Sequence, residues 1–186
     1  RYHRRSPFVG WLSSTALLRP VVAFAGKRQL PSMFHPQGPD SRELDVPLDT
    51  EIEGNEAHDL GLWQKQSSLL FQAMAARTIM RRNVAYNLPR AAINLNDDHG
   101  GGDLITANVL VNAVRESGDH GPVNSWSRLP YITPIRNGSM SILPKPRVIQ
   151  GNVILGTYSS QECIDNDDGS AWYNTTGNVL IYAQYG

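Results

Sequence analysis

Apolar residues along this chain fall in short runs, many of them β-branched, which Asn, Gly or Pro interrupts. A pair of helices would instead need apolar residues at positions i, i+3, i+4 and i+7 over about ten or more residues. The observed pattern predicts short β-strands joined by sharp turns. The residues that define these runs are Ile79, Val84, Ile93, Ile105, Val109, Val111, Ile149, Val153 and Ile154.

Five segments share a further pattern, an asparagine with a branched residue shortly before it and Val or Ala shortly after it. They read IEGNEAHDLG, IMRRNVAYNL, ITANVLVNAV, IQGNVILGTY and TTGNVLIYAQ, with the asparagines at Asn55, Asn83, Asn108, Asn152 and Asn178. The intervals between these asparagines are 28, 25, 44 and 26 residues, so one insertion interrupts a period of about 26. A period of this length is typical of a solenoid.

We therefore predict an all-β fold, a right-handed parallel β-helix (solenoid) of about five coils with an inserted loop. The asparagines would form a column at one corner, because Asn tolerates the left-handed backbone of a tight bend and can hydrogen-bond to the Asn above it. Asn55, Asn83 and Asn108 should stack at about 4.8 Å, and Asn152 should join them despite the insertion. The alternative is a set of unrelated asparagines in a β-rich domain.

Residues 1–50 lack the repeated asparagine pattern. We expect them to form an N-terminal cap or extension and a linker, and residues 51–186 to form the β-helix. An apolar stretch near the start loosely resembles a signal peptide, although Arg19 and Pro20 interrupt it. A cap would cover the strand edges that an end coil exposes. The coil that begins at Asn178 stops after one strand, which indicates a β-helix truncated at its C-terminal end.

The balance of charged residues and the lengths of the apolar runs limit the kinds of partner that we expect. Lys and Arg together number 17, as do Asp and Glu, so no overall field attracts nucleic acid or an anionic membrane. No apolar run approaches the roughly twenty residues that span a bilayer. We therefore expect no nucleic-acid partner and no membrane span. The single cysteine, Cys163, excludes an internal disulfide, and the repeat places it in a strand as a buried residue.

Aligning the coils on their asparagines indicates where chemistry would lie, because residues at equal offsets stack. Gln66, Asn94 and Asp119 share one offset, and the fourth coil would bring Asp165 beside them. Carboxylates one coil apart repel by roughly 3 kcal/mol at a dielectric constant of about 20. Either one carboxyl group stays protonated and can serve as an acid/base group, or a cation binds among them, or basic residues neutralise them. The basic residues nearby are Lys65, Arg90, Arg115 and Arg128. A solvated turn column is the structural alternative. The candidate catalytic group is Glu116, Asp119 and His120, with Arg128 as an anion holder.

The insertion between Pro122 and Pro146 supplies further candidates, since long insertions in solenoids often form the walls of a binding groove. Its aromatic residues could stack on sugar rings or could only pack the loop. The candidate substrate-binding residues are Gln66, Asn94, Asn96, Trp126, Tyr131 and Asp165.

Clustered aspartates in tight turns offer the oxygen ligands that a hard cation needs, so Ca²⁺ is the candidate cofactor. No Cys/His spacing indicates zinc, and no glycine-rich loop indicates a nucleotide. The predicted metal ligands are Asp97, Asp98, Asp167 and Asp168.

A set of longer motifs follows in a specific order and spacing. It comprises GLWQKQSS from Gly61, PRAAIN from Pro89, NDDHGGGD from Asn96, RESGDHGP from Arg115, NSWSRLPY from Asn124, DNDDGS from Asp165 and YNTT from Tyr173. Over about residues 51–186 these motifs resemble a poorly characterised branch of the pectin-lyase-like superfamily of right-handed parallel β-helix proteins. The resemblance implies the fold. The superfamily consists largely of polysaccharide lyases, hydrolases and epimerases, but a fold carries activity over less well than architecture.

Two classes of function remain open. The first is a carbohydrate-binding or carbohydrate-active protein, such as a polysaccharide hydrolase or lyase, that is extracellular or at a cell surface. The second is a non-catalytic structural or assembly module within a larger complex. In the second class other protein subunits would dock at the open ends of the solenoid, where strand edges are unpaired.

Overall fold

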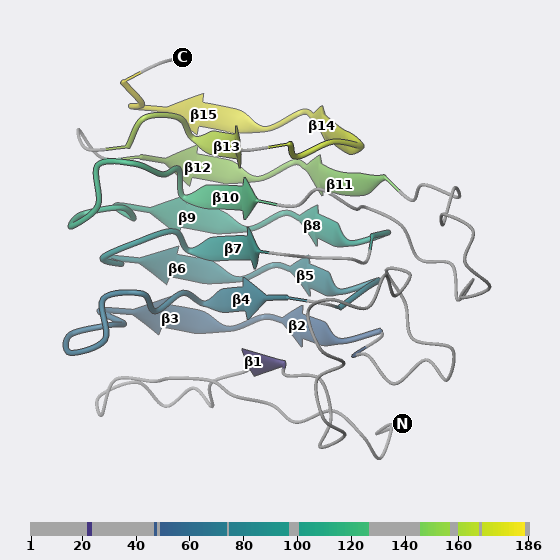
Figure 1. Cartoon of the computed structure of the whole chain (residues 1–186), viewed down its shortest axis with the longest axis horizontal. Coiled ribbons are helices and arrows are strands. Elements are labelled where there is room, and N and C mark those ends of the chain that lie inside the picture. The colour runs from purple at the N-terminus through teal and green to yellow at the C-terminus, as the bar shows by residue number, and fades with distance from the viewer. Residues whose placement is uncertain are drawn as a thin grey trace, which may run out of the picture.

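The computed structural model describes residues 22–23, 47, 49–73, 75–96, 101–126, 146–156, 160–167 and 169–184. All regular structure within these ranges is β-strand, and the strands form three parallel sheets (Figure 1). The predicted all-β class is therefore confirmed. None of the described segments forms a helix long and apolar enough to cross a membrane.

Among the described residues each sheet contains five strands, and neighbours within a sheet are three strands apart in sequence. The first sheet contains β1 (Val22–Ala23), β4 (Leu70–Gln72), β7 (Ile93–Asn96), β10 (Val123–Trp126) and β13 (Ile164–Asp167). The second sheet contains β2 (Glu51–Glu53), β5 (Ile79–Arg81), β8 (Leu104–Thr106), β11 (Arg147–Gln150) and β14 (Tyr173–Thr176). The third sheet contains β3 (Glu56–His58), β6 (Val84–Tyr86), β9 (Val109–Val111), β12 (Val153–Leu155) and β15 (Val179–Ile181).

This order means that each turn of the chain adds one strand to each sheet, so successive coils lie one above another (Figure 1). Every strand pairing is parallel and joins residues one coil apart. The arrangement is consistent with a parallel β-helix. β1 extends the first sheet from within the segment that we expected to act as a cap, whereas residues 1–21 and 24–46 lie outside the described part of the chain.

The core lies between the sheets because alternate residues of each strand point inward. In each sheet one apolar side chain per coil stacks on the next, and burial of each Val, Leu, Ile or Met contributes about 1.5 to 3 kcal/mol. The second sheet contributes Ile52, Met80, Ile105 and Ile149, the third contributes Ala57, Ala85, Leu110 and Ile154, and the first contributes Leu70, Ile93 and Val123.

Cys163 is buried in this core, although it lies immediately before β13 and not in a strand. Its Sγ is 3.6 Å from the carbonyl oxygen of Ile181 and 3.9 Å from that of Ile154. Burial raises the pKa of the thiol, so the residue remains a neutral core side chain.

The five repeated asparagines form one continuous ladder between the second and third sheets. The Oδ1 atom of Asn83 accepts hydrogen bonds from both the backbone N–H and the Nδ2 of Asn55, at 3.0 and 2.9 Å. The same pair of bonds, at 2.9 to 3.0 Å, joins Asn83 to Asn108, Asn108 to Asn152 and Asn152 to Asn178. The predicted column is therefore confirmed, and Asn152 keeps its place across the 44-residue interval.

The sharp bend that accompanies the ladder lies one residue earlier than we expected. None of the five asparagines has a positive φ, but the residue before each of them does. That residue is glycine in three coils, at Gly54, Gly151 and Gly177, whereas Arg82 and Ala107 occupy it with φ of 55° and 54°. A Cβ added at any of the three glycines would meet no atom within 4 Å, so strain alone, not crowding, favours glycine there.

A buried ion pair joins two coils at the start of their second-sheet strands, β8 and β11. Arg147 Nε donates to Asp103 Oδ2 at 2.8 Å, and both side chains are fully buried. Asp103 Oδ1 also accepts the backbone N–H of Thr78 at 2.8 Å, and the Arg147 guanidinium lies 5.3 Å from the centre of the Tyr173 ring. Because Arg147 is the first residue of β11, this ion pair fixes the start of β11 against the coil that contains β8.

The ladder predicts a specific pattern of stability. Asn108→Leu removes the acceptor of two Asn83 donors and the donor to Met80 O, all of them buried, and should lower the free energy of unfolding by about 3 kcal/mol. Asn178→Leu should lower it by only about 1 kcal/mol, because Asn178 is half-buried and water can replace its bonds. Urea denaturation measures both values, and equal losses would contradict the ladder as a buried network.

Candidate functional site

The outer face of the first sheet carries two columns of largely polar side chains. Ile93 and Leu95 of β7 belong to the core, so Asn94 and Asn96 point outward. The strand register extends both columns over the neighbouring coils. The first column consists of Phe71, Asn94, Asn124 and Asp165, and the second column consists of Asn96, Trp126 and Asp167.

The predicted ladder of Gln66, Asn94, Asp119 and Asp165 is correct for only two members. Asn94 and Asp165 share the first column, with Asn124 between them. Gln66 and Asp119 instead lie in exposed turns that precede β4 and β10, and Phe71 and Asn124 hold the places we assigned to them. The reason is physical: turns of different length separate the third sheet from the first, so a fixed offset from the ladder asparagine loses register there.

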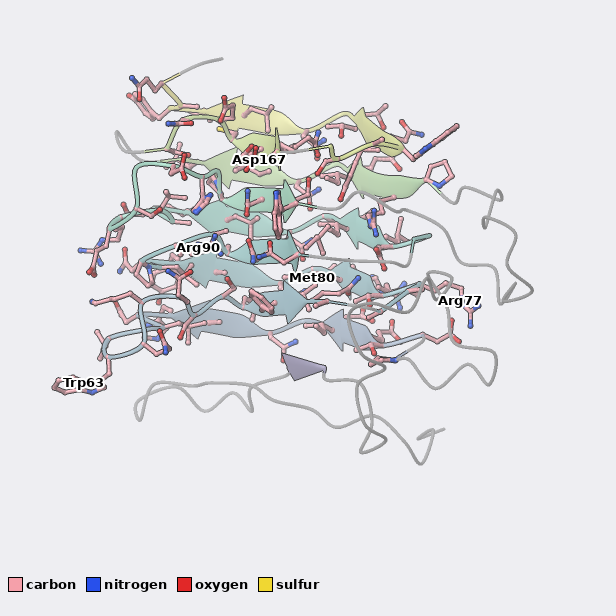
Figure 2. The ribbon with its side chains drawn as sticks, viewed as in Figure 1. Trp63, Arg77, Met80, Arg90 and Asp167 are labelled. Carbon is pink, nitrogen blue, oxygen red and sulfur yellow. The ribbon has the colours of Figure 1, made fainter. Side chains whose placement is uncertain are left out.

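Two turns bring further side chains to the first column. The turn before β7 supplies Arg90, whose Nη2 lies 2.8 Å from Nε2 of His120 in the turn before β10. The other ring nitrogen of His120, Nδ1, is 4.0 Å from Oδ2 of Asp165. Asn124 donates its Nδ2–H to the same Asp165 oxygen at 2.9 Å. Figure 2 shows Arg90 near the level of β7 and Asp167 higher in the stack, at β13.

Burial gives Asp165 an unusual protonation equilibrium. Desolvation, together with the negative charges of Glu162, Asp167 and Asp119, raises the pKa of Asp165 to about 6 against the opposing hydrogen bond from Asn124. The side chain is nevertheless 14% exposed, so a ligand can reach it. Near pH 6 this carboxyl group can therefore both give and take a proton.

His120 is neutral in this setting. Burial and the adjacent Arg90 guanidinium lower the pKa of His120, and the carboxylates of Asp119 and Asp167 offset this only in part. Since an arginine can only donate, Nε2 accepts from Arg90 and the ring proton resides on Nδ1. That N–H faces Asp165, but 4.0 Å is too long for a hydrogen bond between neutral imidazole and carboxylate. His120 and Asp165 are therefore neighbours without a hydrogen bond, and they do not form an ion pair because the imidazole is neutral.

Asn94 is the least satisfied residue of the first column. Its side chain is fully buried, yet neither Oδ1 nor Nδ2 has a hydrogen-bond partner. Asn96 Oδ1, in the second column, is also without one. An unpaired buried amide costs roughly 1 to 3 kcal/mol relative to a hydrogen-bonded one, so Asn94 is a locally unfavourable element of this face.

The other candidate catalytic residues lie in exposed positions. Glu116 accepts a hydrogen bond from Lys65 Nζ at 2.8 Å, and both side chains are about half exposed. This is the neutralisation by a basic residue that the sequence left open. Asp119 is exposed, and its negative charge raises the pKa of both Asp165 and His120.

Of the four predicted metal ligands, only Asp167 lies within the described residues. Asp167 is exposed on β13 and pairs in register with Trp126. In the portion of the chain that the structure describes, no three His, Cys, Asp or Glu side chains form a group that could hold a metal ion. The remaining candidates outside the described residues are Asp97, Asp98, Asp168, Arg128 and Tyr131.

Sequence reasoning missed Asn124 as a member of the site, and it named Arg90 only among the basic residues that could neutralise the carboxylates. A signal for Asn124 was present, because the strands Ile93–Asn96, Val123–Trp126 and Ile164–Asp167 each begin with a branched apolar residue followed by Asn or Asp. Alignment on these strands, in place of the ladder asparagines, gives the correct column. The contact of Arg90 with His120 had no comparable signal, because two turn residues come together only through tertiary packing.

Comparison with known proteins gave no further information on the site: no protein family, no curated protein and no solved structure matches the chain.

The raised pKa of Asp165 predicts a pH dependence of stability with a defined sign. The folded state favours the protonated carboxyl, so the stabilising contribution is present below pH 3.8 and is lost as the pH rises through about 6. Asp165→Asn should therefore be more stable than the parent at pH 7, by at most about 3 kcal/mol, and lose this advantage at pH 4. Thermal or urea unfolding at the two pH values measures the difference. An equal effect of Asp165→Asn at both would contradict the assignment.

Proposed function

We propose that the chain is a right-handed parallel β-helix of the pectin-lyase-like type, extracellular or at a cell surface, that binds and cleaves carbohydrate on the outer face of its first sheet. Three stacked parallel sheets and the motif resemblance support the fold assignment. The single observation that carries the function is a partly accessible carboxyl group, Asp165, whose pKa of about 6 suits proton transfer near neutral pH.

In this proposal Asp165 is the general acid. Its protonated form gives a proton to the glycosidic oxygen, and the carboxylate that results faces the Nδ1–H of neutral His120 and the Nδ2–H of Asn124. The hydrogen bond from Asn124 favours the charged product of the step. Arg90 fixes the imidazole tautomer through Nε2 and so acts as a positioning residue.

Asp167 is the partner carboxylate: it takes a proton from a water molecule whose oxygen bonds to the anomeric carbon, while the bond from that carbon to the glycosidic oxygen breaks and the oxygen leaves with the proton from Asp165. It lies two residues along the same strand as Asp165 and on the same face, so at about 3.3 Å per residue their Cα atoms are roughly 6.6 Å apart, and side chains that extend side by side keep a similar separation. That separation is at the short end of the range for glycosidases that invert configuration with a water molecule between the carboxyl groups. Trp126, beside Asp167 in the second column, offers a ring face on which a sugar can stack.

Incubation of the full chain with a panel of polysaccharides tests this proposal. We expect new reducing ends with a maximum rate near pH 6, and a loss of at least about 100-fold in Asp165→Asn. Glu56→Gln, on the exposed face of the third sheet, is the matched control and should retain the parent rate. Unsaturated product ends would indicate a lyase, and neither binding nor cleavage of any glycan would refute the proposal.

A second function, as an assembly module, is favoured by the outer face of the third sheet. Val84, Val153 and Val179 point outward there and are 38%, 38% and 50% exposed. Other outward positions are apolar too, which leaves a contiguous apolar surface of the kind that commonly marks a protein interface. The outward apolar residues of this face are Val84, Tyr86, Val109, Val111, Val153, Leu155, Val179 and Ile181. Docking of other subunits at the ends of the solenoid remains a prediction.

If the apolar face mediates assembly, the full chain should self-associate at micromolar concentration. The double change Val109→Lys and Val153→Lys places two charges on that face and should yield a monomer with unchanged circular dichroism. Gln150→Lys, an exposed change on the second sheet, is the control and should leave the mass unaltered. Light scattering measures the mass, and a monomeric parent chain would argue against this function.

A further inference from the structure

The chain carries a modification motif that the site on the first sheet does not use. Asn174-Thr175-Thr176 has the form Asn-x-Ser/Thr, in which x is any residue except Pro. This is the acceptor motif for N-linked glycosylation, which occurs on accessible segments of secreted proteins. The motif recurs at Asn137-Gly138-Ser139, which lies outside the described residues.

The strand register places the acceptor amide and the hydroxyl of this motif on the outer face of the second sheet. Asn174 pairs with Val148 and Thr176 pairs with Gln150, and these partners flank Ile149, which belongs to the core. Side chains two residues apart in a strand share a face, so Asn174 and Thr176 both point away from the core. Both are exposed.

The packing of the sheet does not explain an amide at this position. In the three preceding coils the same column holds Ile79, Leu104 and Val148, each half-buried on the outer face. Asn is depleted in strands, where branched residues such as Ile and Val are favoured. The structure records no hydrogen bond between the Asn174 side chain and any described residue. Its Nδ2 is therefore accessible and uncommitted.

The order of events in folding also favours access to this amide. β14 pairs with β11, which lies one coil earlier in the sequence, and such parallel pairing is slow because a long loop has to close first. The motif is therefore still outside the sheet for a time after synthesis. In the folded chain a glycan on Asn174 extends from the outer face and displaces no packed side chain.

We propose that Asn174 is a site of N-linked glycosylation on the outer face of the second sheet. The co-reactant is an oligosaccharide joined through its anomeric carbon to a polyprenyl pyrophosphate. Asn174 Nδ2 bonds to that carbon, the bond from the carbon to the pyrophosphate oxygen breaks, and the amide proton passes to a base of the transferase. The proposal rests on the extracellular location in the proposed function, because the transferase acts in the secretory pathway.

Expression of the full chain behind a cleavable secretion signal in a eukaryotic host tests this proposal. Peptide mapping by mass spectrometry should find a glycan on Asn174, and a peptide N-glycosidase should release it and leave aspartate. Mapping at the level of peptides separates this glycan from any at Asn137. The same chain made in the cytosol of that host, without the signal, is the negative control and should carry no glycan. An unmodified Asn174 in the secreted, folded chain would overturn the proposal.

Three variants test whether the motif directs the attachment. Asn174→Gln and Thr176→Ala should each abolish the glycan at this position, because the first removes the acceptor and the second removes the hydroxyl that the motif requires. Thr175→Ala is the matched control and should retain the glycan. All three side chains are exposed, so each variant should keep the circular dichroism spectrum of the parent. A glycan on Asn174 that persists in Thr176→Ala would contradict attachment through this motif.

The same samples separate this proposal from the proposed cleavage of polysaccharide. Asn174 lies on the second sheet and Asp165 on the first, so the glycosylated parent and Asn174→Gln should cleave at equal rates. A glycosylated chain that cleaves no polysaccharide would refute the cleavage and leave the glycosylation site standing. A secreted chain that cleaves polysaccharide but carries no glycan on Asn174 would do the reverse.

Discussion

The hydrogen bonds of the asparagine ladder are the constraint on which the rest of this structure depends. From Asn83 onward, each Oδ1 accepts two bonds from the asparagine of the coil before it, and each Nδ2 also donates to a strand carbonyl of that coil. A slip by one residue would break this network and turn the core side chains of two strands outward. Because the ladder lies between the second and third sheets, it fixes which residues of β6, β9 and β12 face the core.

The ladder leaves the opposite corner free to vary. Turns between the third and first sheets differ in length from coil to coil, and these turns deliver Arg90, His120 and Glu162 to the first sheet. A rigid face of short strands thus holds Asn94, Asn124 and Asp165, while variable turns adjust the charges around them. This division between scaffold and variable connection is common where a repeat protein acquires a binding site.

The fold was largely predictable because its determinant is local and repeated. Asn83, Asn108 and Asn152 each sit in the same short pattern, and one residue type can satisfy the ladder's need for an acceptor and a donor in a small side chain. The site was only partly predictable. Asp165 and Asn94 were placed in one column correctly, but Asp119 was not, since counting across a turn of unknown length loses the register. The contact between Arg90 and His120 depends on how two turns pack, which no single-sequence spacing records.

The ion pair between Asp103 and Arg147 has a consequence for engineering. It joins Asp103, immediately before β8, to Arg147, the first residue of β11, and Asn108 and Asn152 of the ladder join the same two coils. Because both charged side chains are fully buried, replacing either one alone would leave the other charged and unpaired. Any redesign of this level of the solenoid therefore has to change the two residues together, for example to apolar side chains of similar volume.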